Sequence, residues 1–452
     1  MGNSGSSSAS KKLHTVASPY HSQLEALFDK LSHNGMSIQQ GNFKQHFEGP
    51  TERLSDALYE QICKANGGSV RDGHKPQSVE HQSKRSFIDN AHNLLEQAFK
   101  VKDSTIRFYF ELMVGQDEET TLQDMKKLLR EACLYAIAVI DPEAQHEVAV
   151  DDPIIEALAK SCILHNTSVC KEKFCTWALD FNPKIFSGLE AWLHERFTGH
   201  IQRGHFHMLP MPDMTISEHS FPLLTPSLLW YLCCVLPICY TRLEKSQSYN
   251  QPCDSLESDS SRFYTWNIIY DSNEHGLSLN RFKHKCLNYP SPTVTLVRFT
   301  NGLLLALALD EPWRDSSDRF GGSYSCLLEI LPTCNSILEA QNIFYLRETA
   351  RSAPKGLLVG QGLPPKIKIE SDLSSAVLVY KGSTTEDIAK IEVWGCGGVL
   401  AVAAQKKQLD WEKNEIEKMR KVKRPGRWDD NPDKQILEMA GIQTSHNQRG
   451  DM

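Results

Sequence analysis

The sequence predicts an α+β protein with an all-helical N-terminal half, a two-sheet antiparallel β-sandwich with flanking helices, and a charged C-terminal helix. Three observations support this. Apolar residues recur at helical spacing from Ser22 to about Leu236, the spacing changes to alternation after a polar stretch at Leu243–Ser261, and charged residues dominate Gln405–Arg424. The chain has 452 residues, which is too many for one compact core.

Composition excludes several classes of protein. Hydrophobic residues are 40% and charged residues 23% of the chain, which is typical of folded domains. The formal net charge of -7 argues against nucleic-acid binding, since such proteins concentrate positive charge against phosphates. The 13 cysteines are scattered without a C-x-x-C pair or a secretory signal, which predicts reduced thiols in the cytosol.

Residues 1–20 are predicted to form a disordered, N-myristoylated tail. The opening Met-Gly-Asn-Ser-Gly-Ser fits the N-myristoylation pattern, with Gly2 as the acceptor once Met1 is removed. An ordinary serine-rich terminus is the alternative. One myristoyl chain binds membranes only marginally, so a protein partner is expected to supply the second contact.

The helical domain is expected at 21–219, as several short helices. Leu24–Phe47 and Ile106–Leu129 look like degenerate EF-hands, with Leu122 after an acidic loop in the second; if Leu122 holds loop position eight, the loop ends are Gly115 and Lys126. Their loops lack the oxygen ligands that calcium requires, so helix packing without metal is predicted. The uncharged run Phe221–Thr241 is interpreted as a buried helix rather than a membrane span, because its prolines leave only Pro226–Leu236 uninterrupted.

The β-sandwich is expected at 220–404, with 243–261 as a polar loop. Thr300-Asn301-Gly302 predicts a hairpin, because Asn and Gly tolerate positive φ. Seven short strands are predicted from alternation and turn signals: Thr293–Phe299, Leu303–Leu309, Tyr324–Leu331, Ile343–Leu346, Lys366–Glu370, Ala376–Tyr380 and Ile388–Trp394.

Residues 405–452 are expected to hold a charged helix and a tail, with a short last helix at Pro432–Gly441. Leu409, Ile416 and Met419 form one narrow apolar stripe of the charged helix, and Trp411 falls elsewhere. A solvated helix and a partner-binding helix are both compatible with this pattern.

No constellation for catalysis is found. The phosphate-binding loop and the dinucleotide fingerprint are both missing. Three histidines, His200, His205 and His207, lie close together without the spacing of a zinc site. We therefore expect a protein that is not an enzyme and that holds no cofactor or metal.

The strand-rich half resembles the TLDc family over roughly Phe221–Ala404. The resemblance rests on Phe263–Tyr270 followed by His275-Gly276-Leu277-Ser278, and most specifically on Ile391-Glu392-Val393-Trp394. The N-terminal Met-Gly-Asn-Ser and the helical first half resemble the lysosomal, mTOR-associated (eak-seven) type. Departures are a strand Leu303–Leu309 without glycine and a reduced small-residue motif at Gly356–Gly362.

That resemblance implies residence on the cytoplasmic face of the lysosomal membrane with a cytosolic pool, a role in mTOR signalling with its components as partners, and binding to V-ATPase subunits. The hypothesis is a non-catalytic, membrane-tethered adaptor, with Trp411, Ile416 and Met419 as partner-binding anchors. The alternative is an oxidation-resistance protein that acts through a reactive thiol such as Cys326 or Cys334.

Overall fold

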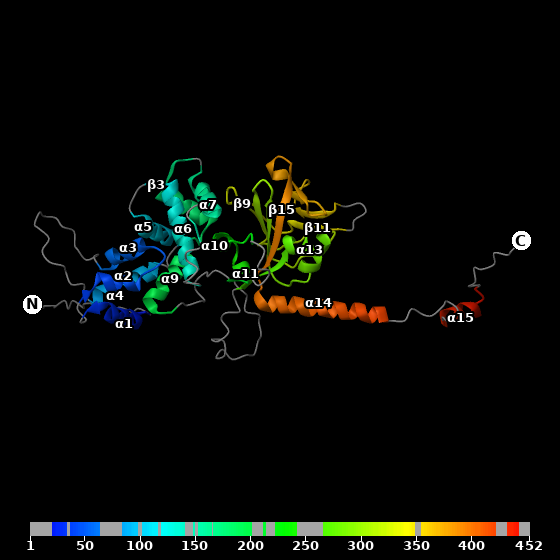
Figure 1. The fold of residues 1–452 in the computed structure, drawn as a ribbon, viewed down its shortest axis with the longest axis horizontal. Coiled ribbons are helices and arrows are strands. Elements are labelled where there is room, and N and C mark those ends of the chain that lie inside the picture. Colours follow the sequence, from blue (N-terminus) through cyan, green and yellow to red (C-terminus); the bar gives the residue numbers. More distant parts are fainter. Residues whose placement is uncertain are drawn as a thin grey trace, which may run out of the picture.

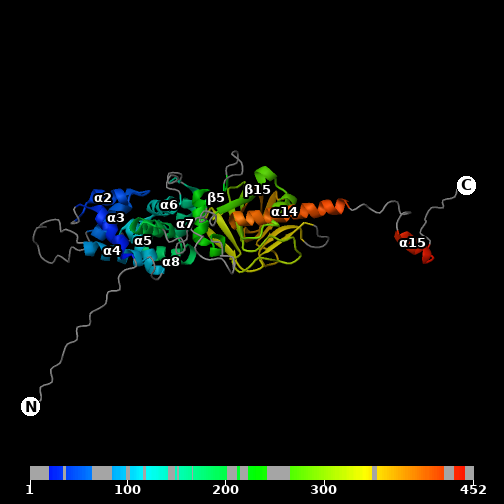
Figure 2. The ribbon, with the colours of Figure 1, turned by 90° about the horizontal axis from the view of Figure 1, so that it is seen from below.

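The computed structural model describes residues 20–33, 37–63, 84–97, 102–115, 119–140, 148–149, 152–164, 166–200, 211–213, 222–241, 265–348, 354–421 and 432–442. The helical half occupies one end of an elongated molecule and the β-rich half lies beside it (Figure 1). A long helix runs along the β-rich half and points away from the helical half (Figures 1 and 2).

The N-terminal half is helical, as predicted. Its helices are α1 (His21–Leu31), α2 (Gln40–His46), α3 (Glu52–Cys63), α4 (Lys84–Gln97), α5 (Lys102–Val114), α6 (Leu122–Ala138), α7 (Pro153–Ile163), α8 (Lys171–Phe181) and α9 (Ser187–Thr198). The start of α7 follows the predicted signal: Pro153 is its first residue, and Asp152 Oδ1 accepts hydrogen bonds from the amides of Ile154 and Ile155 at 2.8 and 3.3 Å.

The helix-loop-helix units differ in detail from the expectation. The first unit joins α1 and α2 through two short strands, β1 (Ser32–His33) and β2 (Ser37–Ile38), which pair with each other. The second unit joins α5 and α6, and its strand β3 (Glu119–Thr121) pairs with β4 (Ser168–Cys170) between α7 and α8. No pattern in the sequence predicted this pairing of β3 with β4.

Leu122 follows the second loop, as the sequence indicated, and is the first residue of α6, because Thr121 caps the helix by accepting a hydrogen bond from the amide of Asp124 at 3.3 Å. Lys126, the loop end in the position-eight register, is instead buried on α6, and its Nζ lies 3.8 Å from Glu156. These contacts give the second helix-loop-helix unit a structural role in packing the helical half.

The run before the β-rich half forms helix α10 (Pro226–Val235), followed by α11 (Ile238–Thr241). Every residue from Ser227 to Cys234 is buried, which confirms the prediction of a buried helix. Among the residues that the structure describes, no helix has the length and hydropathy needed to cross a bilayer.

The β-rich half contains two sheets that share one long strand. The strands are β5 (Met211–Asp213), β6 (Thr265–Asp271), β7 (Thr293–Phe299), β8 (Leu304–Leu309), β9 (Cys326–Leu331), β10 (Asn335–Glu339), β11 (Phe344–Arg347), β12 (Gly356–Val359), β13 (Ile367–Ile369), β14 (Ser375–Leu378) and β15 (Thr384–Gly395). The first part of β15 pairs with β14 and the rest pairs with β6 and β7. The pairing is antiparallel except between β5 and β6.

All seven predicted strands are present; β7 has the predicted ends and the other six have shifted ends. The chain leaves β14 at Leu378 and continues as a 3-10 turn at Val379–Lys381, so the predicted strand to Tyr380 was too long. The hairpin between β7 and β8 turns at Asn301 and Gly302, and Gly302 has φ of 92° as the turn chemistry requires.

Both faces of the sheet built on β6 to β9 are covered. Along β8, Leu304, Ala306 and Ala308 pack into the core of the helical half, whereas Leu305, Leu307 and Leu309 pack into a second core between the two sheets. The run is therefore apolar at every position, as expected for a strand buried on both sides. Helix α10 belongs to the first core, so the two halves of the molecule share one hydrophobic core.

Four further helices complete the fold: α12 (Ser272–His275), α13 (Leu279–Cys286), α14 (Gly398–Lys421) and α15 (Pro432–Met439). The last of these lies within the predicted Pro432–Gly441. Helix α14 begins at Gly398 rather than at the predicted Gln405, so the expected boundary between sandwich and charged helix falls inside a helix.

Candidate functional site

Helix α14 begins where a glycine-rich turn lets the chain pass close to the sandwich. A Cβ at Gly395 would lie 2.3 Å from the Tyr289 ring, and one at Gly397 would lie 2.3 Å from Ser291 Oγ. The amide of Gly397 donates to the Tyr289 hydroxyl at 2.8 Å. Larger side chains at these positions would push the helix off the sandwich.

The first part of α14 is bound to the sandwich along one face. Ala401 and Gln405 are buried, and Gln405 Nε2 donates to the carbonyl oxygen of Lys285 at 2.6 Å. Further along, Asn288 Nδ2 donates to Glu412 Oε2 at 3.1 Å. This anchored part was not expected, because the charge density of the sequence concealed the small apolar residues before Gln405.

The second part of α14 carries large apolar side chains that are exposed. Ile416 is 51% exposed and Met419 is 73% exposed. At 100° per residue they lie on the same helix face as the buried Ala401 and Gln405. The face that packs on the sandwich therefore continues beyond it as an exposed apolar stripe, which we call the outer stripe (Ile416 and Met419).

Trp411 belongs to another face of α14. It is 57% exposed and lies at nearly the same helical angle as Leu400, which is 61% exposed. The three predicted anchors thus form two surfaces, with Trp411 separated from the outer stripe, as the sequence pattern indicated. Beside the stripe, Lys418 Nζ pairs with Glu415 at 2.6 Å.

Gly2, the predicted lipid acceptor, lies outside the described residues, as do His205 and His207 of the histidine cluster. The described member, His200, places its Nδ1 3.2 Å from the carbonyl oxygen of Thr198. Across the described ranges, no group of three or more His, Cys, Asp and Glu side chains is arranged to hold a metal ion.

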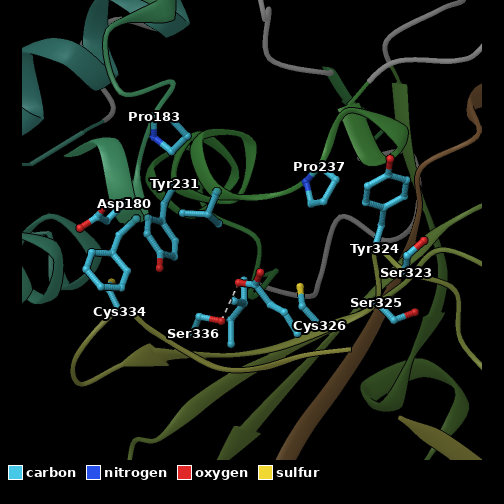
Figure 3. A pocket seen from close by; sticks show the side chains of 14 residues that line it. Asp180, Pro183, Tyr231, Pro237, Ser323, Tyr324, Ser325, Cys326, Cys334 and Ser336 are labelled. Atoms are coloured by element: carbon cyan, nitrogen blue, oxygen red, sulfur yellow. Dashed lines mark hydrogen bonds between the residues drawn. The ribbon is translucent and has the colours of Figure 1, made fainter. Parts of the chain in front are cut away.

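The two candidate thiols both line a cavity of about 210 Å³ between the two halves of the molecule, and Cys334 lies nearer than Cys326 to Tyr231 of α10 (Figure 3). Burial raises the pKa of the Cys326 thiol and of the Cys334 thiol well above the usual value. Cys334 Sγ also donates to the carbonyl oxygen of Ile330 at 3.1 Å. Both effects favour the thiol over the nucleophilic thiolate.

A buried ionic group fixes the segment before α10 onto the sheet. Glu392 is fully buried and accepts hydrogen bonds from the amide of Leu223 at 2.8 Å and from Trp394 Nε1 at 3.0 Å. Its charge is balanced by Lys390 Nζ at 2.7 Å, which also lies 3.3 Å from Asp271. Because Lys390 pairs with both Glu392 and Asp271, these charged groups have a structural role.

The comparison with known families agrees with this architecture. Residues 239–397 match the TLDc domain family. The matched segment starts after α10 and ends at the residue before α14, so the two helices flank the TLDc domain on either side. The predicted limits of 220–404 included α10 and the first residues of α14.

Curated relatives cover only part of the chain. Restriction of telomere capping protein 5 of Neurospora crassa is 24% identical over 259 residues, which are 41% of this chain and 43% of that protein. The protein of the same name from Candida glabrata is 24% identical over 292 residues, 53% of this chain and 51% of that protein. The chain spans about half the length of the curated relatives it matches.

Proposed function

We propose that this chain is a non-catalytic TLDc-domain regulator that acts by docking on another protein assembly through α14. The observation that carries the proposal is the outer stripe, which continues a buried helix face past the edge of the sandwich. Exposed aliphatic side chains at regular helical spacing are the anchors used when a helix lies in a partner's groove. Trp411 supplies a second anchor on the adjacent face.

The proposed partner is the V-ATPase at the cytoplasmic face of the lysosomal membrane, in support of mTOR signalling. This part rests on the resemblance to the lysosomal, mTOR-associated type of TLDc protein. The test is a pulldown of the full chain from lysosomes with and without V-ATPase subunits. Recovery of the same membrane-bound complex without the pump would contradict the proposal.

Attachment to the membrane is proposed to involve myristoylation of Gly2, with the docked α14 as the second contact. Substitution Gly2→Ala is expected to move the protein from lysosomal membranes to the cytosol. Intact-mass measurement of the protein from cells must show the acyl group on the wild type and not on the variant. An unacylated wild-type glycine would refute this tether and leave docking through α14 unaffected.

The relatives' name supports a second candidate function, the restriction of telomere capping. The chain's formal net charge of -7 argues against direct DNA binding, so this function would also require a protein partner. Fractionation of cells separates the two: the proposal requires the protein with lysosomes, and the second function requires it with chromatin.

An oxidation-resistance role through Cys326 or Cys334 is the remaining alternative. Buried thiols with raised pKa values react slowly with oxidants, so the structure disfavours it. Peroxide consumption by the purified chain, compared with Cys326→Ser and Cys334→Ser variants, tests it. A rate that falls with either substitution would favour this alternative.

A further inference from the structure

The last helix, α15, exposes an apolar face of its own, which we call the α15 face (Ile436, Met439 and Ile442). These side chains are 59%, 81% and 54% exposed. The helix has only eight residues, and isolated helices shorter than about 12–15 residues are marginal in water. We therefore expect another surface to cover the α15 face. Figures 1 and 2 show α15 beyond the end of α14, away from the sandwich.

The outer stripe of α14 matches the α15 face in spacing. Each is built on two side chains three positions apart, Ile416 with Met419 and Ile436 with Met439. Side chains at this spacing lie about 60° apart on one side of a helix. In an antiparallel pair of the two helices, Met419 can lie opposite Ile436, and Ile416 then lies opposite Met439. All four side chains are exposed, so this packing removes apolar surface of both helices from water.

The chain between the two helices is long enough for this arrangement. Residues 422–431 connect α14 to α15. Ten residues span up to about 33 Å when extended, whereas helices in contact have axes only roughly 8–10 Å apart. The end of α14 is therefore within reach of α15 of the same chain.

Charge favours the antiparallel direction. It brings the positive N-terminal end of α15 beside the negative C-terminal end of α14. It also places Asp433 of α15 on the same side of the pair as Arg420 of α14, and both residues are exposed. An exposed ion pair adds little stability, but it disfavours the opposite direction of packing.

We propose that α15 folds back on the end of α14 as an antiparallel partner and covers the outer stripe with the α15 face. The arrangement in Figure 1 is the open one, in which the outer stripe is accessible. In the closed arrangement α15 competes with a docking partner for Ile416 and Met419. This effect on docking rests on the proposed function, whereas the contact between the two helices does not.

Cross-linking of the full chain tests the contact. One variant combines Asp433→Cys with Arg420→Cys on the packed side of α14, and the matched control combines Asp433→Cys with Lys418→Cys on the opposite side. A short bis-maleimide should join the first pair at least about tenfold faster, because packing raises the effective concentration of one thiol near the other. Mass spectrometry of the joined peptides measures the rates. Equal rates overturn the proposal, and so does a cross-link that joins two chains.

Substitutions on the α15 face separate the contact from the proposed function. Ile436→Asp/Met439→Asp, added to the first cysteine pair, is expected to slow cross-linking to the rate of the control pair. In the chain without added cysteines, the same substitutions are expected to tighten the dissociation constant for purified V-ATPase about threefold or more, because the closed population is removed. Unchanged cross-linking overturns the proposal, as does equal binding of V-ATPase by wild type and variant. If neither chain binds V-ATPase, the proposed function fails while the cross-linking result still decides the contact.

Discussion

Helices α10 and α14 flank the same TLDc domain but differ in how they are held. Helix α10 carries no charged residue and is buried between the helical half and the sheet. Helix α14 is charged, is anchored at its first part through Gln405, and exposes apolar residues at its second part. The apolar residues of α10 therefore stabilise the fold, whereas those of the outer stripe of α14 are exposed and available to a partner.

The largest expected loss of folding stability comes from a substitution in the buried helix α10. Trp230 is 1% exposed, and Trp230→Ala is expected to lower the free energy of unfolding by about 3–5 kcal/mol because it leaves a cavity in the shared core. Chemical denaturation monitored by circular dichroism measures this. A loss no greater than that of an exposed substitution such as Trp411→Ala would contradict the shared core.

A second effect depends on pH and concerns an acid buried in the helical half. Burial raises the pKa of Glu190 on α9 from 4.5 to about 8. The folded state therefore keeps a proton that the unfolded chain loses, so the stability contribution is full below pH 4.5 and is lost as pH rises through about 8. By contrast, Glu417 near the end of α14 is exposed to solvent.

The expected outcome is a difference between the wild type and Glu190→Gln that grows with pH. Across this window the wild type should lose roughly 2–4 kcal/mol of stability relative to the variant, which has no proton to lose. Denaturation curves at several pH values from 4 to about 9 measure the difference. A constant difference over that range would show that Glu190 titrates as a solvated acid.

A smaller effect is expected where α7 meets α10. Asp152 Oδ1 caps α7, and its Oδ2 accepts a hydrogen bond from Ser227 Oγ at 2.9 Å. Asp152→Ala should cost about 1–2 kcal/mol, and Asp152→Asn should cost less because the amide oxygen still caps the helix. Equal losses for the two variants would mean that the cap contributes nothing.

The smallest effect is expected at the anchor of α14. Gln405→Ala removes the hydrogen bond to the carbonyl oxygen of Lys285 and should cost about 1 kcal/mol. The matched control Lys407→Ala changes an exposed side chain two residues further along the same helix. Hydrogen exchange of α14 amides should rise in the first variant and not in the second.

The sequence predicted the elements whose signals are local. Pro226 and the apolar run after it defined α10, and Asn301-Gly302 defined the hairpin. Strand β10 was missed because it is an edge strand whose residues are exposed or half-buried, so it shows no alternation. Strand β12 was missed because its four residues are all buried and it starts at a glycine.

The candidate sites were predictable to different degrees. The outer stripe follows from helical spacing, which places Ile416 and Met419 on one face, and their role as anchors stays a prediction. The start of α14 was not, because Gly395-Cys396-Gly397-Gly398 reads as a helix break and only the distant Tyr289 and Ser291 explain the glycines. The cavity lined by Tyr231, Cys326 and Cys334 brings together residues far apart in sequence, and no local pattern could reveal it.

The most direct test of the account is the dissociation constant of the full chain for purified V-ATPase, measured for the wild type and for Ile416→Asp/Met419→Asp. Both side chains are exposed, so the double variant should unfold at the same denaturant concentration as the wild type. Binding should weaken at least about 30-fold, the size of one hot spot, while the control Lys413→Ala binds normally. An unchanged dissociation constant in the double variant would contradict docking through the outer stripe.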